Sequence, residues 1–425
     1  MRHLFLSIFT GICISNIQAQ SPPLQPGTGP GGSSYSHNGV IFSDFTSWLS
    51  GDGYWLFEPN QPKPDSADVI VFNHGYGVFN PGPYGQWIEH LVRKGNIVIF
   101  PKYQLNDASL PNTYTPNAIT GILDALDELN TNPARVKPRM EHFAIIGHSY
   151  GGVVTSNLVT EYATYGTPKP QCFMLCQPGT GGINGGRLTS YTSMDTSYNA
   201  LIVVGNDDIV VGNTFGREIM DSTSISTSHK NYITHYNDSY GSPNLEATHN
   251  EPLCSNNDYD GGTVSAVITG GYVASKQDAV DYYCYWKLAD ALLNCTFYGT
   301  DCEYAFGDTP EQRFMGEWSD GTPVIELEVE PGIEASIPEF ESNIQIYPNP
   351  SSEFIYLDAS KMNLQPTMGK DYFATIQILD SEGKIVLTEL LHSTQTTIEV
   401  KHLSKGSYTL IYRGIKTLTK HLIIY

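Results

Sequence analysis

Ser149 stands between two glycines in the stretch FAIIGHSYGGVV, which covers residues 143–154. The apolar run before it is typical of a buried strand, and the residues after it have the pattern of a helix. At such a turn, side chains two positions before and after the serine would crowd the backbone, so Gly147 and Gly151 fit it. The hydroxyl then lies at the carboxyl end of the strand, near a helix N-terminus that stabilises negative charge. This context predicts a nucleophile rather than a serine in a structural glycine turn.

A nucleophilic serine needs a base, and the base needs an acid that orients it. The acid is expected after the apolar run 200–205, which Asn206, Asp207 and Asp208 follow directly. Asp208 is the preferred candidate because it stands in a G-x-x-D-x-V-V arrangement. Asp207 is the alternative.

A further strand is expected near 230–236, and the base is expected in the loop beyond it, where the segment LEATHNEPL supplies His249. His229 and His235 are rivals, but both fall in or beside that strand. The chain order serine, aspartate, histidine is the order that a sheet of this type requires. The sequence therefore predicts a triad of Ser149, Asp208 and His249.

Two backbone amides are expected to bind the oxyanion of an acyl-transfer reaction. The first belongs to Tyr150, directly after the nucleophile. The sequence HGYG at 74–77 immediately follows the apolar run 67–73. Gly75 lets the backbone turn its amides toward a substrate, so the N–H of Tyr76 is the second predicted donor.

The elements that carry these residues alternate between strand and helix from about residue 40 to 320, which is typical of a parallel α/β sheet. The expected strands are short apolar runs rich in β-branched residues, as in strands buried on both faces, at 67–73, 96–101, 142–147, 172–177 and 200–205. The expected helices are 84–95, 115–130 and 276–294. Thr115 is expected to cap the second helix, with Pro116 at its first position.

The composition indicates an exported globular protein. A net charge of −21 argues against nucleic acid and anionic membrane surfaces as partners. Residues 1–19 have a basic start, an apolar stretch of about twelve residues and small residues at the end, which predicts a secretory signal peptide. Cys13 makes a lipoprotein signal the alternative. No other stretch is long and apolar enough to cross a bilayer, so no integral membrane segment is expected.

Export changes how the cysteines are interpreted, because disulfides form in oxidising compartments. Six cysteines follow the signal peptide, and Cys295 and Cys302, which close a short loop, are the expected pair. The pairing of the others is left open. No cysteine or histidine pair has zinc spacing. The segment 255–262 (SNNDYDGG) has oxygen ligands that suit calcium, but a solvated acidic loop is preferred, so neither a metal nor a cofactor is predicted.

The sequence predicts two domains after the signal peptide. Residues 20–39, rich in Pro, Gly and Ser, are interpreted as a flexible segment that precedes a catalytic domain over 40–324. Residues 325–341 hold six glutamates and no basic residue, which is typical of an acidic linker. Residues 342–425 alternate apolar and polar positions between turn residues, as in an antiparallel β-rich, sandwich-like module.

The H-G-x-G loop, the G-H-S-x-G-G elbow and the late aspartate and histidine resemble the α/β-hydrolase superfamily over about residues 40–320. Within it, residues 74–104 and 147–152 are similar to dienelactone-hydrolase, chlorophyllase and cutinase-type esterases. The resemblance implies a doubly wound, mostly parallel sheet and hydrolysis of carboxylic esters through an acyl-enzyme. It assigns the triad and the oxyanion donors to the residues named above. The cysteine nucleophile of the narrower dienelactone hydrolases is absent here, so their substrate does not transfer.

The tail from about residue 342 contains IQIYPNP near its start and KGSYTLIYRG and KHLIIY near its end. It resembles the C-terminal sorting domain of the type IX secretion system. That resemblance implies the secretion machinery as a partner and a secreted or cell-surface location. A small β accessory domain that binds carbohydrate or substrate is the alternative.

The predicted site is open, because only about 22 residues, 178–199, separate the fourth and fifth predicted strands, too few for a large apolar lid. Tyr76 and Tyr150 are expected to flank the reacting carbonyl as substrate-binding residues. Trp87 is a third candidate and Tyr103 a neighbour. Aromatic walls around an open cleft favour a bulky or polymeric ester, such as a polyester or cutin-like chain.

Two other functions stay open. A serine peptidase or acyl-aminopeptidase shares the triad but usually carries a further accessory domain. A non-catalytic surface binding protein on a hydrolase fold is expected to lack one triad member, and none is missing here.

Overall fold

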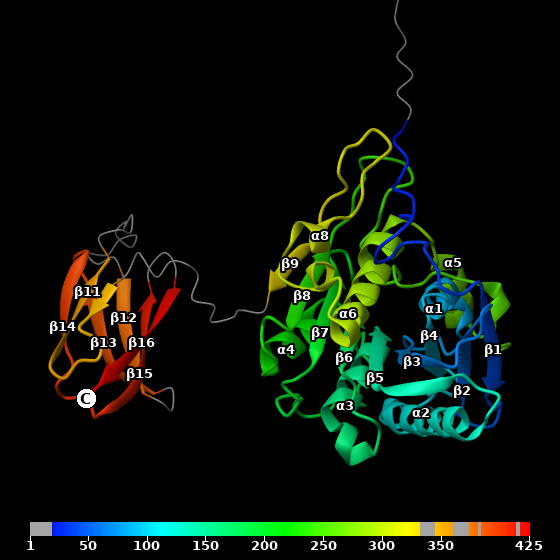
Figure 1. Ribbon diagram of the computed structural model, residues 1–425, viewed down its shortest axis with the longest axis horizontal. Helices are drawn as coiled ribbons and strands as arrows, with labels where there is room; N and C mark the ends of the chain where they lie inside the picture. Colours follow the sequence, from blue (N-terminus) through cyan, green and yellow to red (C-terminus); the bar gives the residue numbers. More distant parts are fainter. Residues whose placement is uncertain (1–18, 332–344, 360–373, 381–383, 414–416) are drawn as a thin grey trace, which may run out of the picture. The chain divides into compact units, whose positions relative to one another are not determined.

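The computed structural model of the chain describes residues 19–331, 345–359, 374–380, 384–413 and 417–425 (Figure 1). It divides into two compact units, Met1–Gly332 and Ile333–Tyr425. The predicted signal peptide up to residue 18 lies outside the described residues, and so does the predicted linker from residue 332 onward.

A nine-stranded sheet forms the centre of the first unit. Its strands in spatial order are β1 (Gly39–Phe45), β2 (Tyr54–Asn60), β4 (Asn96–Pro101), β3 (Ser66–Asn73), β5 (Lys137–His148), β6 (Cys172–Cys176), β7 (Asn199–Gly205), β8 (Lys230–His235) and β9 (Glu328–Pro331). The strands from β4 to β8 run parallel, and β1, β2 and β9 are antiparallel to their neighbours. The predicted α/β fold with a mostly parallel sheet is confirmed.

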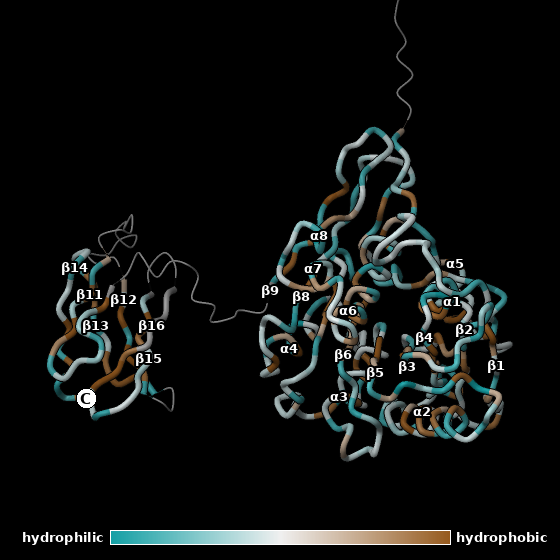
Figure 2. The backbone as a smooth tube through the Cα atoms, in the orientation of Figure 1, coloured by the Kyte–Doolittle hydropathy of each residue, from teal (hydrophilic) through white to brown (hydrophobic). Residues whose placement is uncertain are grey.

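Helices cover both faces of this sheet. On one face lie α1 (Gly85–Arg93) and α6 (Trp286–Tyr298), and on the other lie α2 (Tyr114–Thr131), α3 (Tyr150–Tyr165) and α4 (Thr214–Ser222). Strand β3 supplies both cores: Ile70 and Phe72 pack toward the first face, and Val69 and Val71 toward the second, because successive strand side chains alternate. Hydrophobic stretches accordingly lie along central strands of the sheet such as β5 (Figure 2).

Shorter helical segments complete the first unit. They are α5 (Ala266–Ala274), α7 (Cys302–Ala305) and α8 (Pro310–Arg313), three 3-10 turns (Gly82–Tyr84, Pro111–Thr113 and Asn257–Tyr259) and one π-helical turn (Asp281–Tyr285). None of the helices in the described part of the chain has the length and hydropathy needed to cross a bilayer.

Two predicted helix starts differ from the structure. The helix expected at 115–130 begins at Tyr114 after a 3-10 turn, so Thr115 is not its cap. The Thr115 hydroxyl oxygen instead accepts a hydrogen bond from Asn157 Nδ2 at 2.8 Å. The helix expected at 276–294 starts with the π-helical turn and only then becomes α6.

Residues 20–39, predicted to be flexible, pack against the first unit. The N–H of Gly31 donates to Oδ2 of the buried Asp290 at 2.9 Å. The amides of Ser36 and His37 both donate to the carbonyl of Arg93 at 3.1 Å. The composition suggested flexibility, but acceptors on α1 and α6 satisfy this backbone and hold it in place.

The first part of the predicted acidic linker is also structured. Strand β9 pairs with β8, and Glu330 accepts two hydrogen bonds of 2.7 Å from the Arg217 guanidinium. Leu327 and Val329 are buried between the glutamates. Because the apolar residues alternate with acidic ones, residues 328–331 form an edge strand instead of the predicted start of a linker.

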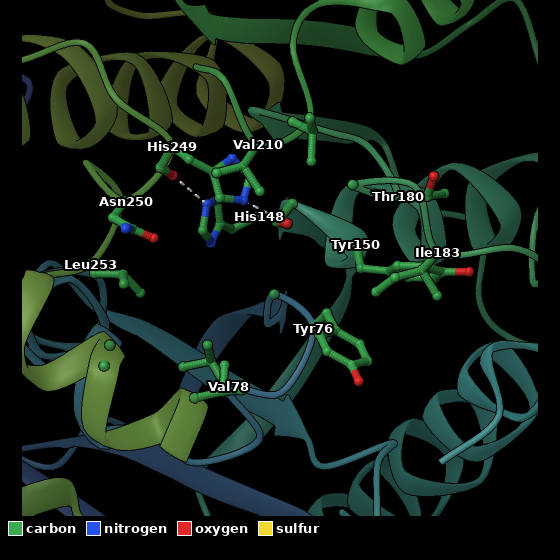
Figure 3. Close-up of a pocket in the computed structure, with 17 residues that line it drawn as sticks. Tyr76, Val78, His148, Tyr150, Thr180, Ile183, Val210, His249, Asn250 and Leu253 are labelled. Carbon is green, nitrogen blue, oxygen red and sulfur yellow. Dashed lines mark hydrogen bonds between the residues drawn. The ribbon is translucent and has the colours of Figure 1, made fainter. Parts of the chain in front are cut away.

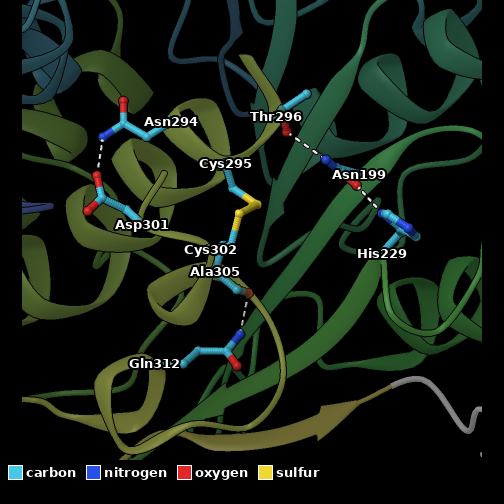
Figure 4. The surroundings of a disulfide bond; sticks show 9 residues. All are labelled: Asn199, His229, Asn294, Cys295, Thr296, Asp301, Cys302, Ala305 and Gln312. Atoms are coloured by element: carbon cyan, nitrogen blue, oxygen red, sulfur yellow. Dashed lines mark hydrogen bonds between the residues drawn. A yellow bond between two sulfur atoms is a disulfide. The ribbon is translucent and has the colours of Figure 1, made fainter. Parts of the chain in front are cut away.

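Cys295 and Cys302 form the predicted disulfide, which joins the end of α6 to α7 (Figure 4). Asn294 Nδ2 donates to Asp301 Oδ2 at 2.8 Å across the same loop. The other cysteines of the described residues are buried free thiols: Cys172, Cys176, Cys254 and Cys284.

The second unit consists of two antiparallel sheets. One contains β10 (Gln345–Tyr347), β11 (Phe354–Asp358) and β14 (Gln395–Glu399), and the other β13 (Ile385–Leu391), β12 (Ala374–Leu379), β15 (Gly406–Arg413) and β16 (Thr417–Ile424). Alternate residues such as Ile355, Leu357, Ile376 and Ile378 form one shared core. The predicted C-terminal all-β region is confirmed.

Candidate active site

Ser149 occupies a tight turn between β5 and α3. Its φ and ψ of 55° and −123° lie in a region that residues other than glycine rarely adopt. A Cβ on Gly147 would lie 2.3 Å from the carbonyl oxygen of Gly151, and one on Gly151 would lie 2.2 Å from that of Asn73. Both predicted glycines are therefore required by space, and the turn raises the Ser149 hydroxyl at the end of the strand.

The structure brings Ser149, His249 and Asp208 into one hydrogen-bonded chain. Ser149 Oγ lies 2.8 Å from His249 Nε2, and His249 Nδ1 lies 2.7 Å from Asp208 Oδ2. All three residues are buried. Figure 3 shows His249 beside His148 and Val210 among the residues that line the pocket. With Nδ1 protonated toward Asp208, Nε2 is free to accept the serine proton.

Asp208 is fixed by its own backbone neighbours. Its Oδ1 accepts hydrogen bonds from the amides of Val210 and Val211 at 2.9 and 3.0 Å. Burial raises the pKa of Asp208, but the hydrogen bond and charge of His249, with the two amides, more than offset burial and hold the pKa below its usual value. The carboxylate therefore stays ionised to orient the histidine.

The rival residues lie elsewhere. Asp207 adjoins Asp208 in the sequence, but it is exposed, and its carboxylate accepts a hydrogen bond from Asn237 Nδ2. His229 is exposed and bonds to Asn199 at 2.6 Å. His235 is buried, and its Nε2 lies 2.9 Å from the hydroxyl of Tyr285. Within the described part of the chain none of the three is hydrogen-bonded to Ser149, whereas His249 and Asp208 form the bonded chain with it.

The amides around the predicted oxyanion site divide into occupied and unoccupied groups. The N–H of Gly75 donates to Tyr84 Oη at 2.8 Å, and that of Gly77 to Gln104 Oε1 at 2.9 Å. Among the described residues, no acceptor takes the amides of Tyr76 and Tyr150. Both residues line the pocket beside Ser149, and the binding of an oxyanion by their amides stays a prediction.

The pocket around Ser149 has a volume of about 450 Å³. Its lining contains no Asp, Glu, Lys or Arg side chain. The residues that line it are Gly75, Tyr76, Val78, His148, Ser149, Tyr150, Thr180, Gly181, Ile183, Val210, Val211, His249, Asn250, Leu253, Val267, Gly270 and Gly271. Figure 3 shows Tyr76 and Ile183 on one side of it and Leu253 on the other. The site is suited to an uncharged, largely apolar substrate.

Trp87, a predicted substrate-binding residue, is not brought to the pocket. It is fully buried on α1, where its ring contacts Phe72 and Tyr285 at centroid distances of 5.1 and 5.7 Å. Tyr103 is equally buried and stacks on His74 at 3.8 Å. Both rings belong to the packing beneath the site.

Sequence reasoning missed two groups of residues. Leu253 and the α5 residue Val267 line the pocket, but apolar residues in a loop and a short helix carry no distinguishing pattern. His148 and Tyr84 lie directly beneath the site and bond to each other at 2.8 Å. The only signal for His148 was its place before the serine in the G-H-S motif.

No cluster of three or more His, Cys, Asp or Glu side chains arranged for a metal occurs in the described part of the chain. In the segment 255–262, Asp260 Oδ1 accepts hydrogen bonds from Asn80 Nδ2 at 2.7 Å and from the N–H of Gly262 at 2.8 Å. Asn256 Oδ1 accepts one from the N–H of Asp258 at 3.0 Å. Internal donors therefore use two of the side-chain oxygens that suggested calcium.

Two protein-family models match the chain. Residues 58–176 match chlorophyllase, and residues 345–425 match the secretion system C-terminal sorting domain. The first match runs from β2 to the end of β6, so it includes Tyr76 and Ser149 and stops before Asp208 and His249. No curated protein matches the chain.

Proposed function

The chain joins a chlorophyllase-like, α/β-hydrolase-type region to a secretion system sorting domain, and from this premise we propose that it is a secreted serine carboxylic-ester hydrolase. The observation that carries the proposal is the hydrogen-bonded chain of Ser149, His249 and Asp208 at the edge of an uncharged pocket. Export through a signal peptide and type IX sorting of the tail belong to the same proposal.

The reaction follows from the positions of the side chains. His249 Nε2 takes the proton of Ser149 while Oγ attacks the ester carbonyl, and the carbonyl oxygen gains the negative charge. The free amides of Tyr76 and Tyr150 bind this oxyanion. His249, now an imidazolium paired with Asp208, returns its proton to the departing alcohol oxygen. A water molecule then repeats the sequence on the acyl-enzyme, which releases the acid and restores the serine.

The substrate is proposed to be a neutral ester with apolar groups. The lining has no ionic side chain, and Val78, Ile183, Leu253 and Val267 supply apolar walls. A charged substrate would lose hydration in this pocket without gaining an ionic partner. A long or aromatic acyl chain gains instead from burial against these walls.

Exposed aliphatic side chains lie beside residues that line the pocket. Ile209, next to the lining residue Val210, is 96% exposed, and Val273 on α5 is 82% exposed. Val264, just before α5, is 83% exposed. Exposed apolar side chains on the segments that line the pocket support a bulky or polymeric ester, because a chain longer than the pocket can contact them.

The proposal is tested with the mature full-length chain on p-nitrophenyl esters of increasing acyl length, and on p-nitroanilide peptides as the competing class. The expected result is ester turnover that rises with acyl length and is lost in Ser149→Ala without a change in thermal stability. Turnover of peptides alone would indicate a peptidase. Ester turnover that survives in Ser149→Ala would refute the assigned nucleophile.

A further inference from the structure

Two buried polar side chains beneath Ser149 link three separate loops. The Tyr84 hydroxyl lies 2.8 Å from both the N–H of Gly75 and Nδ1 of His148. On the other side of the His148 imidazole, Nε2 lies 2.9 Å from the carbonyl oxygen of His249 (Figure 3). Tyr84 and His148 are 0% and 2% exposed, so water does not compete for these bonds.

The acceptors fix the direction of every bond in this chain. The carbonyl of His249 only accepts, so Nε2 of His148 carries a hydrogen. Burial lowers the pKa of His148 to about 3, and the charge of the nearby His249 contributes a smaller part of this shift. The ring is therefore neutral, and Nδ1 is an acceptor. The Tyr84 hydroxyl therefore donates to Nδ1, and its oxygen accepts from the Gly75 amide.

This chain of bonds connects the two loops that must be aligned with Ser149. At one end it holds the amide directly before Tyr76, which sets the direction of the next peptide. At the other end it holds the backbone of His249, whose imidazole lies 5.0 Å from that of His148. His148 itself adjoins the nucleophile in sequence, so one set of bonds spans the oxyanion loop, the nucleophile turn and the base loop.

We propose that Tyr84 and His148 are positioning residues that hold the oxyanion amide of Tyr76 and the base His249 in register with Ser149. This rests on the proposed function, because positioning matters only if Ser149 is the nucleophile. Neither side chain exchanges a proton with the substrate. Their contribution is to keep donor and base where the charged intermediate needs them, so it is felt in turnover more than in substrate binding.

The test compares Tyr84→Phe, which keeps the ring and removes the hydroxyl, with Tyr198→Phe. Tyr198 is as deeply buried and donates to the carbonyl of Val159 at 2.8 Å, so it controls for loss of a buried tyrosine hydroxyl elsewhere in the fold. Tyr84→Phe is expected to lower kcat about 10- to 100-fold with little change in KM. Tyr198→Phe is expected to lower Tm to a similar degree and leave kcat near the wild-type value.

A second variant separates the two hydrogen bonds that His148 makes, one with Tyr84 and one with the His249 carbonyl. In His148→Gln, the amide nitrogen still donates to the His249 carbonyl, but the bond from Tyr84 is lost. His148→Gln should retain more turnover than His148→Leu, which makes neither bond. Adding Tyr84→Phe to His148→Gln should cost less than Tyr84→Phe costs in the wild type, because one shared bond is already absent.

Nitrogen NMR of the histidine rings in the wild-type chain tests the geometry without any turnover. The expected form of His148 is neutral with its hydrogen on Nε2, and a hydrogen on Nδ1 would overturn the proposal even if every variant failed to fold. A folded Tyr84→Phe variant with wild-type kcat would also overturn the proposal, provided that Ser149→Ala is inactive. The same holds if Tyr84→Phe loses no more kcat than Tyr198→Phe does. Absence of ester turnover in the wild type would instead overturn the proposed function, and absence of peptide turnover as well would remove the positioning role with it.

Discussion

Replacing Asp208 by asparagine tests the geometry of the site most directly. The variant is nearly isosteric, and Oδ1 of Asp208 accepts from the amides of Val210 and Val211. An asparagine must keep its carbonyl oxygen toward those two donors, so its NH2 group faces His249 Nδ1. The histidine then accepts at Nδ1 and carries its hydrogen on Nε2, where it cannot take the proton of Ser149.

The size of the effect follows from the charge that is removed. In the transition state His249 becomes an imidazolium, with Nδ1 2.7 Å from a buried carboxylate oxygen of Asp208. Two unit charges about 4 Å apart interact by about 4 kcal/mol at an effective dielectric constant of about 20. That corresponds to about a thousandfold in rate, and the wrong tautomer adds to it. We therefore expect kcat to fall by at least about a thousandfold.

The assay is steady-state hydrolysis of a p-nitrophenyl ester, with circular dichroism to confirm folding. Asp207→Asn is the matched control, because Asp207 is the adjacent carboxylate and is exposed. The control should stay within about threefold of the wild type. A folded Asp208→Asn that keeps a tenth of wild-type activity, or a control that loses as much as Asp208→Asn, would refute the assignment of the acid.

Three further predictions concern the frame around the site. Gly151→Ala should abolish turnover and lower Tm, because the new Cβ would lie 2.2 Å from a carbonyl oxygen of β3, whereas Gly27→Ala, which meets nothing within 4 Å, should leave both unchanged. Loss of the Cys295–Cys302 bond, by reduction or in a double serine variant, should cost about 2–3 kcal/mol of unfolding free energy in denaturant titrations, and the variant should no longer respond to reductant. Burial raises the pKa of Glu251 to about 7 from 4.5, so the stability linked to its protonated form is present below about pH 4.5 and lost as pH rises through 7. In urea unfolding, Glu251→Gln should therefore stabilise the chain by up to about 3 kcal/mol near pH 8 and not near pH 4. An equal gain in stability at both pH values would contradict the raised pKa of Glu251.

The triad candidates could be chosen from the sequence because Ser149 and Asp208 each follow an apolar run typical of a buried strand, and His249 lies in a loop beyond the next strand. In a parallel sheet the carboxyl ends of the strands meet at one edge, so Ser149, Asp208 and His249 were expected together before any distance was known. The turn at Ser149 was equally readable, since the glycine spacing reflects a steric requirement that the structure shows at Gly147 and Gly151.

Features that depend on tertiary contacts were not readable in the same way. Trp87 was assigned to the pocket because aromatic rings often line one, but its place on α1 turns it toward the sheet, among Phe72 and Tyr285. Residues 20–39 have the composition of a flexible segment, and only the buried acceptor Asp290 explains why Gly31 is held. Neither fact follows from local pattern, because each partner lies far away in the sequence.

The residue between Gly147 and Ser149 shows where pattern and structure part. The motif formed by Gly147, Ser149 and Gly151 alone leaves this position free, yet His148 is buried and has a polar partner on each side of its ring. An apolar residue there would satisfy the motif and leave the Tyr84 hydroxyl and the His249 carbonyl without the partner that they have now. The side chain is therefore constrained by the loops that it joins. Because both loops carry groups that the proposed reaction needs, the same contacts that stabilise the fold set the accuracy of the site.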